Sequence, residues 1–454
     1  MILLLILLTS CNSIGHKEEL KENKAEFSPM ELPAGSKSNY DLSLSLDENG
    51  EFKVKASIEI TNLSKDAWES LVFYFIPNMF TQDNAPELDK PGSLNVQKVS
   101  VNGKEVNYFL EKDTFTVPLK EKVQSKEEKN IEITYSFTLP EKGHRYTEND
   151  SNYYLAQWYP MVPTYRDGWN KEEYRSKGES YHTTFSDFDF SYKVPEEYTV
   201  ITSSDTENLP TLKEQKVKAE SVKEFYVAIL RHPEILEKEK QGVTIRIFSS
   251  DQTNRKEEVL ETALQALDYF QNKIGPYPHK QLDIILSDIG MEYPGVVTVD
   301  NSRGVRMESL KDEVVHEIAH QWFYGVINND PYRDAWLDEG LANLATSLFL
   351  ADVESEDVQL PNEFYPNLQP VNLPLDHYQK DYHTQVYGNS PIGLWNIFRQ
   401  HGGKEAAENF LTKYYLTYKY KEVNTEEFTR FLNHQLDIKD PSIYDDWLQL
   451  KHSQ

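Results

Sequence analysis

Two histidines and a glutamate, spaced as ligands of one metal ion, are the residues of this sequence best suited to chemistry. His316 and His320 lie four positions apart in an apolar segment with a helical pattern, and Glu339 follows nineteen residues later. Positions i and i+4 share one face of an α-helix, so both imidazoles can bind the same ion. Two histidines, one glutamate and an open fourth position are typical of catalytic zinc. The sequence therefore predicts one zinc ion per chain.

Glu317 stands beside the first histidine and can point toward the ion without binding it. Zinc lowers the pKa of a bound water to about 7, and a nearby carboxylate can take the water's proton and pass it to a leaving amine. Two histidines and a glutamate on a buried helix without an ion would be costly to desolvate. We therefore interpret Glu317 as the general base of a zinc-activated water, and the cluster as a hydrolytic site.

The elements that carry this cluster are predicted to follow a separate all-β domain over residues 37–237. Residues 40–46 and 52–60 alternate apolar and polar side chains, and residues 47–50 supply a hairpin turn between them. No long segment of helical periodicity interrupts the strands that follow. This domain is expected to be a sandwich or a curved open sheet. Further strands are predicted at 70–76, 94–101, 105–110, 130–139, 183–194, 197–203 and 222–231.

Residues 238–454 are predicted to form an α+β domain with strands first and helices later. The zinc-binding helix is expected over 307–326 and the helix of Glu339 over 336–352. The remaining expected elements are strands at 243–248, 282–286 and 296–299, and helices from 250 or 251 to 270 and at 390–400, 404–418, 425–435 and 441–450.

Composition narrows the class of protein. At 454 residues the chain can form two or three domains. Its formal charge of −27 argues against nucleic acid as a partner and against electrostatic docking on anionic lipid. A 12% aromatic content argues for a folded chain, and the single cysteine, Cys11, excludes an intrachain disulfide.

The first residues resemble an export signal. Residues 1–10 are mostly apolar but too short to span a bilayer as a helix, and Leu8-Thr9-Ser10-Cys11 resembles a bacterial lipoprotein cleavage box. We expect Cys11 to be lipidated and residues 11–36 to form a flexible tether on the extracytoplasmic face of the cell membrane. A simple secretory signal, which would give a secreted protein, or a buried N-terminal strand would also fit this pattern.

Two longer motifs resemble those of a known family. The segment HEIAHQWFYG, followed by WLDEGLA, resembles the gluzincin zinc aminopeptidases, the class of aminopeptidase N and the leukotriene hydrolase. Gly290-Met291-Glu292 is similar to the Gly-x-Met-Glu-Asn exopeptidase signature of that family, with Tyr293 in place of its Asn. Asp338 likewise replaces an Asn in the second motif. The resemblance implies a β domain followed by a thermolysin-like catalytic domain, in a short form without the large C-terminal helical domain.

The resemblance also implies substrate-binding residues. Glu292 would pair with the free α-ammonium of a peptide and fix its distance from the metal, within a loop that includes Gly290 and Met291. Gln157 of the β domain would be a second anchor. Tyr387, or otherwise Tyr382 or Tyr378, would donate a hydrogen bond to the oxyanion.

We therefore predict a zinc aminopeptidase that hydrolyses the N-terminal bond of peptides with a free N-terminus, anchored to the membrane by lipid. A zinc endopeptidase would use the same metal ligands and the same general base. The motifs are also compatible with a non-catalytic peptide-binding lipoprotein and with an epoxide hydrolase on the same scaffold.

Overall fold

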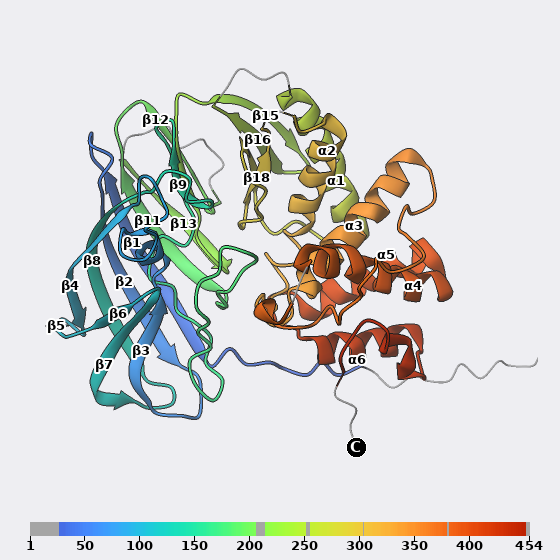
Figure 1. Cartoon of the computed structure of the whole chain (residues 1–454), viewed down its shortest axis with the longest axis horizontal. Helices are drawn as coiled ribbons and strands as arrows, with labels where there is room; N and C mark the ends of the chain where they lie inside the picture. Colours follow the sequence, from blue (N-terminus) through green and yellow to red (C-terminus); the bar gives the residue numbers. More distant parts are fainter. Residues whose placement is uncertain (1–26, 206–213, 251–254, 303, 379–380, 451–454) are drawn as a thin grey trace, which may run out of the picture.

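The computed structural model describes residues 27–205, 214–250, 255–302, 304–378 and 381–450. A strand-rich part and a helix-rich part lie side by side, joined by a smaller sheet that belongs to the helical part (Figure 1). The predicted order, an all-β domain followed by an α+β catalytic domain, is confirmed.

The β domain begins with a long hairpin. β1 (Ser36–Leu46) and β2 (Phe52–Asn62) pair antiparallel, and β1 buries every second side chain from Tyr40 to Leu46. On its other side β1 pairs in parallel with β11 (Ser186–Lys193). The remaining strands of the domain are β3 (Trp68–Tyr74), β4 (Ser93–Val101), β5 (Lys104–Glu105), β6 (Phe109–Glu111), β7 (Thr114–Val123), β8 (Glu128–Thr138), β9 (Tyr146–Asn149), β10 (Asn152–Leu155), β12 (Tyr198–Thr202), β13 (Glu214–Val222) and β14 (Val227–Arg231).

These strands form three sheets around one core. The sheet orders are β13-β11-β1-β2-β8-β4-β5, β3-β7-β6 and β12-β14-β10-β9. A single hydrophobic cluster contains buried residues from all three sheets, including the stacked rings of Tyr40 and Phe188. The shared core joins the three sheets into one domain.

The catalytic domain opens with a four-stranded sheet in the order β15-β16-β17-β18. β15 (Glu234–Lys240) pairs antiparallel with β16 (Val243–Ser249), and β17 (Gln281–Ser287) and β18 (Val296–Asp300) continue in parallel. The helices are α1 (Lys256–Lys273), α2 (Met307–Ala319), α3 (Trp336–Glu354), α4 (Ser390–Gln400), α5 (Gly403–Tyr418) and α6 (Thr425–Leu436).

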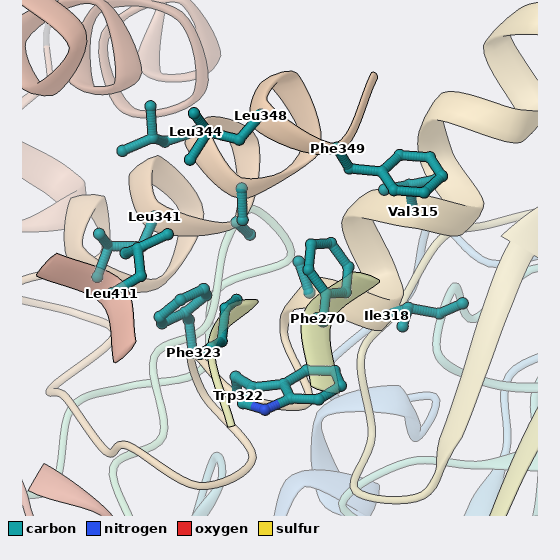
Figure 2. Packing of buried hydrophobic residues seen from close by; sticks show 14 of the residues in the cluster. Phe270, Val315, Ile318, Trp322, Phe323, Leu341, Leu344, Leu348, Phe349 and Leu411 are labelled. Atoms are coloured by element: carbon teal, nitrogen blue, oxygen red, sulfur yellow. The ribbon is translucent and has the colours of Figure 1, made fainter. Parts of the chain in front are cut away.

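Aromatic packing holds α2 and α3 in place. Phe270 of α1 contacts Trp322, which follows α2, and Phe349 of α3, with ring centroids 5.5 and 6.2 Å apart (Figure 2). Val315 and Ile318 of α2 are fully buried in the same cluster. Because this core joins three helices that are far apart in sequence, it sets the distance between the histidines on α2 and the glutamate on α3.

Three sequence-based boundaries need correction. The border expected at residue 237 falls inside β15, which pairs with β16 and so belongs to the catalytic sheet. The zinc helix ends at Ala319 instead of 326, because the next residues fold into tight turns. In place of a helix over 441–450 there is a single 3₁₀ turn, η4 (Pro441–Tyr444).

The segment 27–35 also differs from the flexible tether expected over 11–36. Phe27 packs edge-on against Phe431 of α6 at 5.0 Å between ring centroids, and the Arg430 guanidinium lies 4.3 Å from the Phe27 ring. The Met30 amide donates to Glu427 Oε1 at 3.0 Å. This segment therefore lies against α6 before it enters β1 (Figure 1). Cys11 and the apolar run before it lie outside the described residues.

Candidate active site

The three predicted metal ligands meet in one place. His320 Nε2 lies 3.1 Å from His316 Nε2 and 3.1 Å from Glu339 Oε2, and the third edge, His316 Nε2 to Glu339 Oε2, is 3.3 Å. Ligands about 2.05 Å from a tetrahedral zinc would stand roughly 3.3 Å apart. The triangle therefore fits a zinc ion, with the fourth position open to the cavity.

The end of α2 explains how the second histidine is held. His320 is the C-cap residue of α2, and its carbonyl oxygen accepts the Gly325 amide at 2.9 Å. Its Nδ1 donates to the Phe323 carbonyl at 3.0 Å, which leaves Nε2 free for the metal. A backbone acceptor of this kind sets the tautomer and orientation of a metal-binding histidine.

The electrostatic surroundings of the triangle favour a positive charge. Glu339 lies in the first turn of α3 and is buried, with Asp338 beside it. Burial alone lowers the pKa of His320, but the Glu339 carboxylate, followed by Glu317 and Asp338, outweighs burial and raises this pKa to about 9. A cation placed among these groups gains from the same negative surroundings. The donor set and its charge both suit a divalent zinc ion.

Glu317 faces the same cavity as the ligands but does not belong to the triangle. It is 6% exposed, and its Oε2 has no hydrogen-bond partner among the described residues. Burial, and after it the charge of Glu292, raises the pKa of Glu317 well above its usual value. The arrangement thus leaves a buried carboxylate, with one oxygen unpartnered, in the wall of the cavity that the metal ligands also line.

The loop that precedes β18 folds back on it through a single antiparallel β-bridge. The Met291 amide donates to the Thr298 carbonyl at 3.0 Å, and the Thr298 amide donates back at 2.8 Å. Tyr293, the residue that replaces the family's Asn, stacks on Tyr226 of the β domain with ring centroids 3.9 Å apart. The loop is thus held by hydrogen bonds on one side and by a ring from the other domain.

Gly290 and Glu292 of this loop both line the cavity. A Cβ atom at Gly290 would lie 2.6 Å from Glu317 Oε1, so any side chain here would push the Glu317 carboxylate out of its place. Glu292 is 5% exposed, and burial, with the neighbouring charge of Glu179, raises its pKa well above the usual value. A carboxylate in this state is stabilised by a cation placed beside it.

Tyr387 is the tyrosine that the structure brings to the metal position. It belongs to a single π-helical turn, η3 (Thr384–Asn389), that leads into α4. Its hydroxyl donates to Glu339 Oε1, and it lines the cavity. Tyr382 and Tyr378 do not line it, and the Tyr378 hydroxyl donates to the Val371 carbonyl at 2.6 Å.

Gln157, the expected second anchor, does not reach the cavity. Its side chain is 3% exposed, and its Nε2 donates to Glu224 Oε2 at 2.9 Å and to the Tyr181 hydroxyl at 3.1 Å. The backbone at Gln157 has a φ of 48°, and the side chain turns into the β domain. The structure thus places the Gln157 amide in a buried hydrogen-bond network and not among the residues that line the cavity.

The β domain instead contributes Glu179 and Arg145 to the wall of the cavity. Arg145 Nη1 donates to Glu179 Oε1 at 2.6 Å, and the two side chains are 18% and 7% exposed. The sequence predicts neither residue, since Glu179 lies in a loop without periodicity or motif. The cavity, of about 550 Å³, is thus enclosed by both domains.

A second contact joins the β domain to the residues just after α2. Tyr324 has a φ of 130°, a strained conformation for a residue other than glycine, and its hydroxyl donates to Glu224 Oε1. Lys223 Nζ, which has no hydrogen-bond partner among the described residues, lies 3.6 Å from the centroid of the Tyr324 ring. The β domain therefore fixes the turn that also carries the Phe323 carbonyl under His320.

Comparison with known proteins agrees with this geometry. Residues 258–447 match the profile of the peptidase family M1 domain. Aminopeptidase N of Streptomyces lividans is 28% identical over 181 residues, 35% of this chain and 21% of that protein. Endoplasmic reticulum aminopeptidase 1 of Homo sapiens is 22% identical over 218 residues, 41% of this chain and 23% of that protein. The matched part of the chain thus spans less than a quarter of these curated relatives.

Solved structures match over nearly the whole chain. The M1 zinc metallopeptidase from Deinococcus radiodurans superimposes with a TM-score of 0.66 at 16% identity, over 92% of this chain and 95% of that one. A mutant of it bound to a Tyr-Ser-Ala substrate gives a TM-score of 0.64 at 16% identity, over 92% and 96%. The resemblance to the gluzincin zinc aminopeptidases is thus confirmed for the catalytic part of the chain: residues 258–447, which contain both motifs and the zinc-fitting triangle, match a peptidase family M1 domain.

Proposed function

We propose that this protein is a zinc-dependent aminopeptidase that removes the first residue of peptides with a free N-terminus. The observation that carries the proposal is the buried carboxylate of Glu292, which faces the same cavity as His316, His320 and Glu339. A carboxylate enclosed beside a hydrolytic metal site suits an α-ammonium group. By binding this ammonium, Glu292 would place the first peptide bond of the substrate at the metal.

His316, His320 and Glu339 would hold the zinc ion, which supplies a Lewis acid that polarises the scissile carbonyl and acidifies water. Glu317 takes a proton from the attacking water as the water oxygen bonds to the carbonyl carbon. The same carboxyl then gives this proton to the nitrogen of the departing peptide as the C–N bond breaks. Tyr387 stands at Glu339, where its hydroxyl can turn to donate to the developing oxyanion.

A direct assay of N-terminal dependence tests the proposal. Purified, zinc-loaded protein is expected to release the first residue of a free tetrapeptide and to leave the N-acetylated peptide almost uncut, because acetylation removes the charge that Glu292 would bind. Mass spectrometry of the products identifies the bond that is cut. Equal cleavage of both peptides, or cuts in mid-chain, would make the protein an endopeptidase. Binding without any cleavage by zinc-loaded protein would favour a non-catalytic binding protein.

We also propose that Cys11 carries a lipid anchor and places the enzyme on the extracytoplasmic face of a bacterial membrane. The support is the Leu8-Thr9-Ser10-Cys11 box after an apolar run. None of the helices that the structure describes is long and apolar enough to cross a bilayer. Cells are expected to incorporate labelled fatty acid into the wild type but not into Cys11→Ser, which should leave the membrane fraction. Equal membrane retention of both proteins would contradict the anchor.

A further inference from the structure

The charges that line the active-site cavity are unevenly distributed. The arginine and the lysine of the lining, Arg145 and Lys177, both come from loops of the β domain. Arg145 is paired with Glu179, and Lys177 Nζ lies 5.5 Å from the centroid of the Tyr382 ring. The catalytic domain contributes most of the acidic groups. The carboxylates of the lining are Glu179, Glu292, Asp312, Glu313, Glu317 and Glu339.

Apart from Glu179, which is paired with Arg145, Asp312 and Glu313 are the acidic residues of the lining that have no role in the proposed mechanism. They lie one helical turn before His316 and Glu317, so they continue the same face of α2 along the cavity. Asp312 is exposed and Glu313 half-buried. The neighbouring lysine on the helix, Lys311, pairs instead with Glu258 of α1 at 3.1 Å.

The neighbours of these two carboxylates are acidic as well. Burial raises the pKa of Asp312, and the charges of Glu354 and Glu308 raise it further. Burial also raises the pKa of Glu313, although the Asp300 amide, which donates to Glu313 Oε1 at 3.1 Å, lowers it. Within the described residues no arginine or lysine forms an ion pair with either side chain. Their negative charge is therefore available to a ligand.

The loop beside α2 indicates which part of a peptide would meet this charge. Glu292 and Gly290 lie two residues apart in the loop that borders the cavity, and a Cβ atom at Gly290 would lie 2.3 Å from Glu313 Oε1. A peptide whose ammonium is at Glu292 must pass Glu317 at its first peptide bond. Its next residue then lies toward Gly290 and Glu313, because the cavity continues along α2 in that direction.

Resting on the proposed aminopeptidase activity, we propose that Asp312 and Glu313 form a subsite for a cationic side chain at the second residue of the substrate. The favoured substrates are peptides in which lysine or arginine follows the N-terminal residue. Glu317, which is 6% exposed and whose Oε2 has no hydrogen-bond partner among the described residues, lines the same cavity one helical turn further along α2.

Peptides that differ only at the second position test the subsite. Ala-Lys-Ala, Ala-norleucine-Ala and Ala-Glu-Ala are compared by kcat/KM with zinc-loaded protein, since norleucine keeps the length of lysine without its charge. We expect Lys to exceed Glu by roughly tenfold or more, with norleucine between them. In Asp312→Asn/Glu313→Gln the Lys-to-Glu ratio should fall to about threefold or less. The ratio is insensitive to partial loss of folded enzyme, which affects all peptides equally.

Glu405→Gln serves as a control, because Glu405 is an exposed residue of α5 outside the cavity. It removes one negative charge, whereas the double variant removes two. This control should keep the wild-type ratio. The same peptides should bind in the same order to zinc-loaded Glu317→Gln protein in calorimetry, which reports affinity without turnover.

The outcomes distinguish a failure of the proposed subsite from a failure of the proposed aminopeptidase activity. Efficient cleavage with equal rates for the three peptides would overturn the subsite and leave the aminopeptidase intact. The same holds if the double variant keeps the wild-type ratio, or if the preference for lysine attaches to the first residue, as in Lys-Ala-Ala. Tighter binding of the lysine peptide without any cleavage would support the subsite and overturn the proposed activity.

Discussion

Glu317→Gln is expected to keep its zinc and to lose kcat by about 10²–10⁴, the range typical of general-base catalysis. Glutamine has nearly the same shape, but its amide cannot accept the proton of the attacking water. Because Glu317 lies outside the ligand triangle, metal binding should be unaffected. Metal content by mass spectrometry and kcat on a free peptide are the two measurements.

His316→Ala tests the metal ligands, as Glu317→Gln tests the general base. It removes one corner of the triangle, so zinc content should fall well below one per chain and activity should be lost with it. Near-normal turnover in zinc-replete Glu317→Gln would remove Glu317 from the mechanism. Full zinc occupancy in His316→Ala would show that the metal is held by other residues.

Glu292→Ala is expected to lower kcat/KM on free-amine peptides by roughly 30- to 1000-fold with zinc still bound. The reason is the burial of the ammonium–carboxylate pair, where removal of one partner leaves the other charge without compensation. Truncation of one partner in such a pair costs about 2–4 kcal/mol. Steady-state kinetics on a short peptide measure the loss directly.

N-acetylation of the peptide completes a double-mutant cycle with this variant. Acetylation should impair the wild type strongly and Glu292→Ala far less, because the variant has already lost the group that recognises the charge. General damage to the site cancels in the comparison. Equal sensitivity of both proteins to acetylation would mean that Glu292 does not contact the α-ammonium.

The metal triangle can be predicted from sequence because its geometry is local. Helical periodicity alone puts His316 and His320 on one face, and the fixed spacing to Glu339 needs only a second helix that packs on the first. The end of α2 is less predictable. The apolar run continues to Val326, but Trp322 and Phe323 are buried from a turn and not from a helix.

The part of the site that comes from the β domain cannot be predicted in this way. Glu179 reaches the cavity through a loop whose path depends on contacts far away in sequence, including its ion pair with Arg145. Gln157 is predicted from its place in a motif, yet its side chain has Glu224 and Tyr181 as buried partners. The sequence does not show in which direction such a side chain points, because its orientation depends on hydrogen bonds to residues that are distant in sequence.

Because residues 27–35 are attached to α6, they limit the distance between the catalytic domain and the membrane in a lipidated enzyme. If Cys11 is in the bilayer surface, only residues 12–26 separate the lipid from Phe27, which is packed on Phe431. A fully extended chain covers at most about 3.5 Å per residue, so the helical end of the catalytic domain would stay within roughly 55 Å of the lipid. Substrates would then be restricted to peptides that diffuse close to the cell surface.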